Sequence, residues 1–286
     1  MGSVARFTRA IPAKSPAKGP IMTDKDNGAQ MALNRAAALW YLMAAFGQMA
    51  FLLFILLFYY PSALSGNFAA WDKKPNIEGF TAGDTGGNIM FALHVLAAAV
   101  MTAGGLLQLL PALRQKWPKF HRWNGRLFIV TALSLAFGGL WLVWARGSYL
   151  NLTGAIGISL NALLIISFAF LAWQTAIKRK FVKHRLWAMR LFIVANAVWF
   201  MRLGYMIWGV GTGGIGIGDA MDGPYDYFLA FGNSLVPLAI METYLRVKVG
   251  KSDRARYLMA AGLVLCALLT IGGSGAAWMV MWGPYI

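Results

Sequence analysis

Seven long apolar runs constrain the fold of this chain more than any other feature. A helix rises about 1.5 Å per residue, so roughly 20 apolar residues cross a hydrocarbon core of about 30 Å. Lipid offers no partners to backbone polar groups, and the runs are continuous rather than alternating. They therefore predict helices and exclude a membrane β-barrel. The predicted spans cover residues 37–60, 88–110, 127–145, 154–176, 187–209, 227–245 and 257–282.

The composition agrees with a membrane location. Hydrophobic residues make up 59% of the chain, charged residues make up 13%, and the mean hydropathy is +0.58. A soluble domain of this length needs more polar surface. We predict an all-α, polytopic bundle of seven transmembrane helices over residues 37–286, preceded by a basic disordered tail over residues 1–36. Translation begins at Met1 or at Met22, and the sequence does not choose between them.

The basic residues are distributed unevenly along the chain. The net charge is +16, and of the 26 basic residues only Lys73, Lys74, Arg146 and Arg202 lie outside the N-terminal tail and the loops after spans two, four and six. This pattern predicts an N-terminus in the cytoplasm and a C-terminus outside. The excess charge indicates contact with anionic lipid head groups rather than with nucleic acid.

The two longest predicted outer connections differ from the basic loops. Residues 61–87 are rich in aromatic and small residues, and residues 209–226 are rich in glycine and acidic residues. The second contains GTGGIG, but it follows a membrane helix rather than a strand, which excludes a nucleotide cradle. We expect it to form a flexible cap over the outer face.

Two basic segments have nearly the same sequence. Residues 121–130 read HRWNGRLFIV and residues 184–194 read HRLWAMRLFIV, each in a loop that opens an outward-going helix. This echo predicts two duplicated hairpins, residues 88–145 and 154–209, related by an axis along the membrane normal.

These motifs resemble a large family of uncharacterised bacterial inner-membrane proteins, a domain of unknown function. The resemblance covers roughly residues 88–245 and implies a multi-pass protein of the bacterial inner (cytoplasmic) membrane with no established activity. It rests on a histidine in the second span, an HR-x-x-GR motif, an HR-x-W-x-x-R motif and a later membrane arginine. The residues concerned are His94, His121, Arg122, Gly125, Arg126, His184, Arg185, Trp187, Arg190 and Arg202.

A polar pocket is predicted between spans two and five. His94 and Arg202 lie at similar depth, and an ionisable group inside a span normally faces a partner or a cavity. The pocket residues are His94, Met101 and Gln108 on one stripe of span two and Asn196, Trp199 and Arg202 on span five. Arg202 is expected to meet either an aspartate from the glycine-rich loop or an anionic or carbonyl-bearing ligand. The alternative is a polar clamp that only fixes helix packing.

The HR motifs have two interpretations. A b-type haem needs two histidines at matching depth, and His121 with His184 meets that condition. The other interpretation is contact with lipid head groups by residues that snorkel at the membrane edge. The motif side chains concerned are His121, Arg122, Arg126, His184, Arg185 and Arg190. The sequence contains no metal-binding motif and no catalytic motif that we recognise.

Eight tryptophans fall where interfacial belts are expected. They are Trp40, Trp117, Trp123, Trp144, Trp187, Trp208, Trp278 and Trp282.

Three functions remain open from the sequence. The first is an accessory or structural subunit of a larger membrane complex, which small-residue stripes favour. The second is a redox protein that binds quinone or b-type haem. The third is a transporter of small molecules or lipids, for which Pro237 in span six is the only sign of an interrupted helix.

Overall fold

Every regular element of the described chain is a helix. The computed structural model describes residues 24–74 and 79–286. The long helices are α1 (Asp24–Phe54), α3 (Thr85–Leu109), α5 (Pro118–Trp144), α6 (Leu152–Ile177), α7 (Phe181–Ala195), α8 (Ala197–Thr212), α9 (Pro224–Val249) and α10 (Asp253–Ala277). The shorter ones are η1 (Ile55–Tyr59), α2 (Tyr60–Leu64), η2 (Phe68–Lys73), α4 (Pro111–Lys116), η3 (Trp278–Trp282) and η4 (Gly283–Tyr285).

The predicted helical membrane bundle is confirmed. Six continuous helical segments of the described chain are long and apolar enough to cross a membrane. The α7–α8 pair makes a seventh span if its two bent halves are counted together. Each predicted span overlaps one of these segments. Spans 88–110 and 127–145 end one residue beyond their helices, and the other five lie inside theirs.

The start of the first helix differs from the sequence prediction. Helix α1 begins at Asp24, so residues 24–36 are helical rather than part of a disordered tail. Leu33 and Ala36 pack in a buried cluster with Ala260 and Leu263 of α10, and this contact holds the segment as a helix. Residues 1–23, which include both candidate start methionines, lie outside the described residues.

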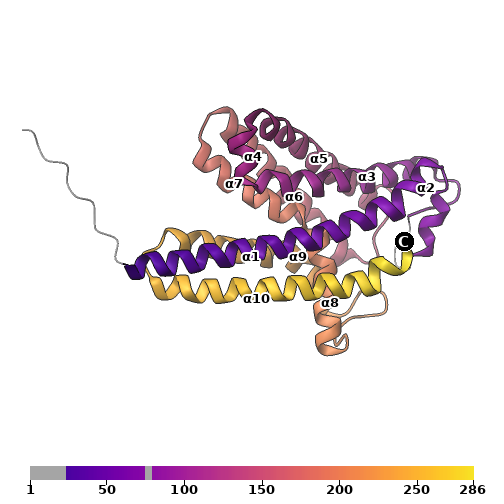
Figure 1. Cartoon of the computed structure of the whole chain (residues 1–286). Coiled ribbons are helices and arrows are strands. Elements are labelled where there is room, and N and C mark those ends of the chain that lie inside the picture. Colours follow the sequence, from indigo (N-terminus) through magenta and orange to yellow (C-terminus); the bar gives the residue numbers. More distant parts are fainter. Residues whose placement is uncertain (1–23, 75–78) are drawn as a thin grey trace, which may run out of the picture.

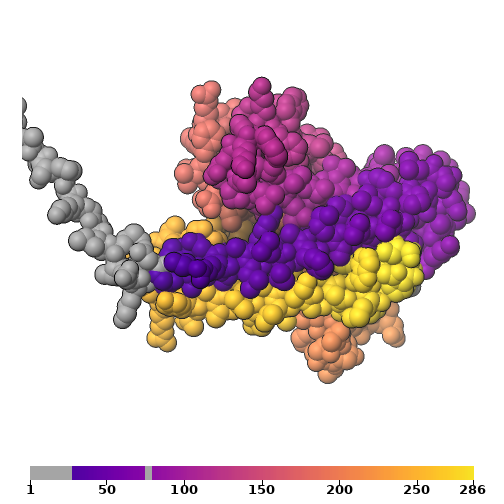
Figure 2. Space-filling model, in the orientation of Figure 1, coloured from indigo at the N-terminus to yellow at the C-terminus, as the bar shows by residue number. Residues whose placement is uncertain are grey.

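The helices form two groups. Figure 1 shows α1 (indigo) lying along α10 (yellow) beside α9, while α3 to α7 form a second group on one flank. In Figure 2 the α1 and α10 surfaces run side by side along the molecule. We name the end with residues 110–126, 178–185 and 246–256 the basic end. The end with residues 65–74, 79–84 and 213–223 and the C-terminus is the opposite end.

The α7–α8 pair is bent by 52° at Asn196, in the middle of the predicted fifth span. The Asn196 side-chain amide donates to the Phe192 carbonyl oxygen at 2.8 Å. In a regular helix the backbone N–H of residue 196 would donate to this oxygen instead. The Asn196 N–H turns to the Ile193 carbonyl at 3.2 Å. A side chain inserted into the helical ladder in this way produces a kink. The predicted continuous helix 187–209 is therefore wrong at this point, whereas α9 runs unbroken through Pro237.

Hydrogen bonds link the glycine-rich connection to neighbouring elements, and its flexibility stays a prediction. The Asp226 carboxylate accepts bonds from the Gly218 and Gly223 N–H groups at 2.8 and 2.9 Å. It also accepts from the Tyr205 hydroxyl at 2.9 Å. Asn151 donates to the Met221 carbonyl at 2.6 Å. These bonds hold Asp226 within the loop.

Candidate ligand site in an aromatic and cationic cluster

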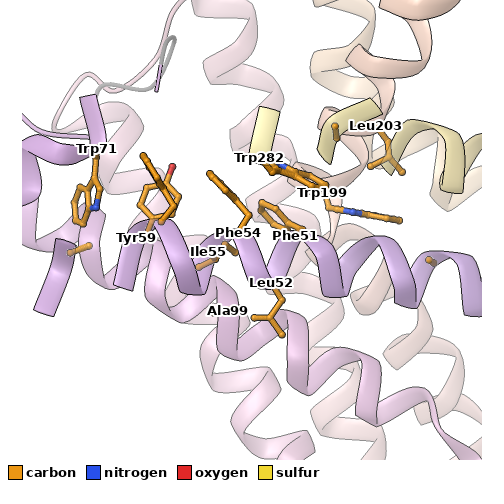
Figure 3. Packing of buried hydrophobic residues seen from close by; sticks show 14 residues of the cluster. Phe51, Leu52, Phe54, Ile55, Tyr59, Trp71, Ala99, Trp199, Leu203 and Trp282 are labelled. Atoms are coloured by element: carbon orange, nitrogen blue, oxygen red, sulfur yellow. The ribbon is translucent and has the colours of Figure 1, made fainter. Parts of the chain in front are cut away.

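Aromatic rings gather at the opposite end, where α1 and the C-terminal segment both widen into π-helix. These segments are η1 and η3, and π-helical turns often mark functional sites. The Phe51 and Trp282 ring centroids are 5.4 Å apart, and those of Tyr59 and Trp71 are 5.7 Å apart. Figure 3 shows the rings of Trp71, Tyr59, Phe54 and Phe51 following one another along α1, with Trp282 and Trp199 beside that row.

Two cations enter this ring cluster from distant parts of the chain. Lys74 is only 5% exposed, and its Nζ donates to the Met281 carbonyl at 2.9 Å. The Lys74 Nζ also lies 4.8 Å from the Tyr285 ring centroid. The Arg202 Cζ lies 4.9 Å from the Phe51 ring centroid. We name the rings of Phe51, Phe54, Tyr59, Trp71, Trp199, Trp282 and Tyr285, together with Lys74 and Arg202, the aromatic–cationic cluster.

The two positive charges act on each other. Burial and then the nearby Arg202 guanidinium lower the pKa of Lys74 to about 8. Within residues 24–74 and 79–286, neither cation forms an ion pair. Residues 75–78, directly after Lys74, lie outside the described part. Because desolvated charge is costly without a counter-charge, the cluster favours an electron-rich partner.

Several buried polar atoms of this region have no hydrogen-bond partner in the described chain. The donors among them include the indole Nε1 atoms of Trp71, Trp199 and Trp282 and the Nε2 atom of Gln48, whose acceptor Oε1 is also without a partner there. These four residues are at most 2% exposed. An unsatisfied buried polar group costs roughly 1–3 kcal/mol, so such groups need an explanation.

Close helix packing brings Trp199 to the α1–α10 contact. A side-chain Cβ at Gly47 would collide with the Ser274 hydroxyl and lie 3.0 Å from the Trp199 ring. Gly47 therefore allows α1, α8 and α10 to approach closely, one turn before Phe51. The Ser274 hydroxyl is also buried, and no group in residues 24–74 or 79–286 forms a hydrogen bond with it.

The three predicted pocket residues of α3 pack mainly toward α5. A Cβ built on Gly139 would lie 3.4 Å from the His94 ring, and the His94 Nδ1 is buried without a hydrogen-bond partner among the described residues. Met101 packs against the buried cluster around Phe128. Gln108 donates to the His121 carbonyl at 2.9 Å.

The other three predicted pocket residues lie on the α7–α8 pair. Asn196 forms the kink, while Trp199 and Arg202 belong to the cluster with α1 and α10. Arg202 also donates to the Val198 carbonyl at 3.1 Å. The single pocket that would join both sets of residues stays a prediction.

The first HR motif lies in the first turns of α5, not in a loop, and it fastens α5 to α3. The Asn124 side chain donates to the Gly104 carbonyl at 2.9 Å, alongside the Gln108–His121 bond. A Cβ on Gly125 would lie 3.4 Å from the Gln108 Oε1, an ordinary van der Waals distance, so Gly125 lies beside this clamp. The HR-x-x-GR pattern thus has a packing role.

The second HR motif lies in α7 and fastens it to α6 and α9. The His184 Nδ1 lies 3.0 Å from the Ala172 carbonyl oxygen. Arg190 forms a paired ion bridge to Glu242 at 2.6 and 3.0 Å, and its Cζ lies 4.5 Å from the Trp187 ring centroid.

The two motifs share an arginine stacked on the tryptophan three residues earlier. Arg126 lies over Trp123 at 4.8 Å, as Arg190 lies over Trp187. Arg122 and Arg185, the second residues of the two motifs, are both exposed. The His121 Nδ1 is buried, with no hydrogen-bond partner in the part of the chain that the structure describes. Haem ligation or head-group contact by these residues stays a prediction. In the described chain, no three His, Cys, Asp or Glu side chains gather as a metal ion would require.

Sequence reasoning missed most of this cluster. Trp282 was expected in an interfacial belt, but it is fully buried. Lys74 was counted among the outer charges, although its partner Met281 lies 207 residues further along the chain. No local pattern signals so distant a contact. Only Arg202 and Trp199, which were named for the predicted pocket, marked the region.

The apolar helices and their antiparallel order define a multi-pass α-helical membrane protein. The family model described as Predicted membrane protein (DUF2306) matches residues 91–245, which is more than half of the chain. The chain belongs to this family. The matched range contains Trp199 and Arg202, whereas Phe51, Lys74 and Trp282 lie outside it. No curated protein and no solved structure matches the chain.

Proposed function

We propose that this membrane protein binds an apolar molecule with an oxygen-bearing head group in the aromatic–cationic cluster. The observation that carries the proposal is the excess of donors over acceptors. Lys74 and Arg202 supply positive charge, and three buried indole N–H groups supply further hydrogen-bond donors. Quinone carbonyls and fatty-acid carboxylates both supply the missing acceptors on an apolar body that suits the surrounding rings.

Equilibrium binding to the purified protein in detergent tests this proposal. Radiolabelled decylubiquinone and radiolabelled oleate are the two probes, so the two head-group chemistries are measured separately. We expect one of them to bind and Lys74→Gln to weaken its binding about tenfold or more, because a hydrogen bond to a charged group contributes roughly 1.5–3 kcal/mol. Lys73→Gln is the matched control, since Lys73 is adjacent but exposed.

Milder variants separate binding from folding. Trp199→Phe and Trp282→Phe keep an aromatic ring but remove the indole N–H together with part of the ring system, so we expect folded protein with weaker binding. The proposal fails if neither probe binds. It fails equally if Lys74→Gln binds the probe as tightly as Lys73→Gln does. It also fails if Glu78→Gln shows that the Glu78 carboxylate alone supplies the counter-charge for Lys74 and Arg202.

Transport of the same ligand is the second candidate function. The break between α7 and α8 at Asn196 favours it, because discontinuous membrane helices commonly form transporter sites. Uptake of the bound probe into proteoliposomes would support transport. Binding without uptake would restrict the protein to a holding role.

A further inference from the structure

A shallow apolar groove of about 300 Å³ lies at the basic end, far along the chain from the aromatic–cationic cluster. Leu107, Leu113, Trp117 and Phe120 line it. They come from the last turn of α3, from α4, from the α4–α5 junction and from the start of α5. The groove thus sits in the corner where the chain turns between two membrane helices.

The corner has a local cause in the backbone. Leu110 is extended, with φ −75° and ψ 113°, and Pro111 then starts α4. Trp117 leaves the helical conformation again, at φ −128° and ψ 66°, before Pro118 starts α5. Two proline-started helices therefore turn the chain sharply and leave Trp117 62% exposed and Phe120 45% exposed.

Unpaired positive charge surrounds this apolar groove. Arg114, Lys116 and Lys119 adjoin the lining residues in sequence, and all three are exposed. The chain has no acidic residue between Asp84 and Asp219. The described ion pairs of the basic end involve Arg190 and Arg256, not these three residues.

We infer that this groove binds one anionic phospholipid, with an acyl chain against the lining residues and the phosphate against the basic rim. Apolar walls alone would suit any lipid. Charge complementarity selects an anionic one, because each basic residue near a membrane surface contributes about 1 kcal/mol toward acidic lipid. A soluble anion would use the rim only, and the exposed Trp117 and Phe120 would have no role.

Native mass spectrometry of the detergent-purified protein, titrated with phosphatidylglycerol or phosphatidylcholine, tests the inference. We expect one phosphatidylglycerol to be retained preferentially. Lys116→Gln/Lys119→Gln should lower its retention about tenfold. The matched control is Lys251→Gln/Arg254→Gln, which removes the same charge from exposed sites in the α9–α10 loop at the same end. Inorganic phosphate, added as a competitor, should not displace the lipid.

A second variant tests the apolar part of the site. Trp117→Ala keeps every charge and removes one exposed wall, so it should reduce retention while the thermal midpoint in detergent stays unchanged. Equal loss in both charge variants would overturn the inference, because diffuse attraction would then explain the binding. Equal retention of the two lipids, or unchanged retention in Trp117→Ala, would also overturn it.

Discussion

At the scale of single residues, Lys74 is the most informative side chain. It is buried beside Arg202, and its pKa is lowered to about 8. The unfolded chain binds this proton more tightly than the folded one. The cost of the charged amine is therefore fully present below pH 8 and is relieved as the pH rises from about 8 toward the ordinary value of 10.5.

The first prediction concerns the pH dependence of stability. Between pH 7 and pH 9.5, the thermal midpoint of the wild type should rise relative to that of Lys74→Met, because only the wild type loses this charge. Differential scanning fluorimetry in detergent measures the difference, and Lys73→Met should follow the wild type. A difference that does not change with pH would contradict the lowered pKa of Lys74.

A second residue-scale prediction concerns the ion pair between Arg146 and Asp84 at the start of α3. Arg146, whose side chain is 6% exposed, donates to Asp84 at 2.9 Å and to Asn88 at 2.8 Å. The Gly87 N–H and the Arg146 guanidinium hold the pKa of Asp84 below its ordinary value. This stability is present above that ordinary value and is lost as the pH falls through the lowered pKa. Arg146→Gln should lower the thermal midpoint at pH 7, and the deficit should shrink at acidic pH.

At the scale of elements, the broken α7–α8 helix shows how a membrane protein satisfies freed backbone groups. Asn161 of α6 donates to the Val194 carbonyl at 2.8 Å and to the Ser234 hydroxyl at 2.9 Å. The Asn196 side-chain amide donates to the Phe192 carbonyl, four residues earlier in the same broken helix. Side-chain amides thus replace the missing helical bonds where water is excluded.

The third prediction removes this support. Asn161→Leu keeps the size of the side chain but leaves the Val194 carbonyl without its donor, so it should destabilise the fold by about 1 kcal/mol. Gln30→Leu is the control. It removes an exposed hydrogen bond from Gln30 to Asn34, so it should change the stability little. Thermal unfolding in detergent measures both. Equal midpoints for Asn161→Leu and the wild type would show that the bond does not support the break.

A fourth prediction concerns the packing of α1 on α10. Gly47→Ala should destabilise the protein by about 1–3 kcal/mol, because its Cβ collides with Ser274. Ser274→Gly should restore much of that loss in the double variant, since it removes the colliding atoms. Additive losses in the double-mutant cycle would show that the two residues do not meet.

At the scale of the whole molecule, the sequence was sufficient for the fold class and for the approximate position of every span. Continuous apolar runs determine these, because lipid permits little else. The break at Asn196 was not predictable, since an asparagine inside an apolar helix can also face a neighbour without disturbing the backbone. The aromatic–cationic cluster was equally hidden, because it joins Lys74 to Met281, which lies 207 residues further along the chain.

Orientation in the membrane is the fifth prediction, and it applies to the whole molecule. The basic end should face the cytoplasm. In a Cys266→Ser background, Lys251→Cys should react with a membrane-impermeant maleimide only after the cells are opened, whereas Ser65→Cys should react in intact cells. The reverse pattern would place the basic end outside and contradict the charge distribution.

The central claim is that the aromatic–cationic cluster holds an apolar ligand with an oxygen-bearing head group. The most direct test is mass spectrometry of small molecules and proteins that co-purify with the natively extracted protein. We predict one quinone or fatty acid per chain in the wild type and in Lys73→Gln, and its loss in Lys74→Gln. A protein that carries no such molecule, and instead co-purifies only with a larger protein complex, would contradict ligand binding and support the accessory-subunit role.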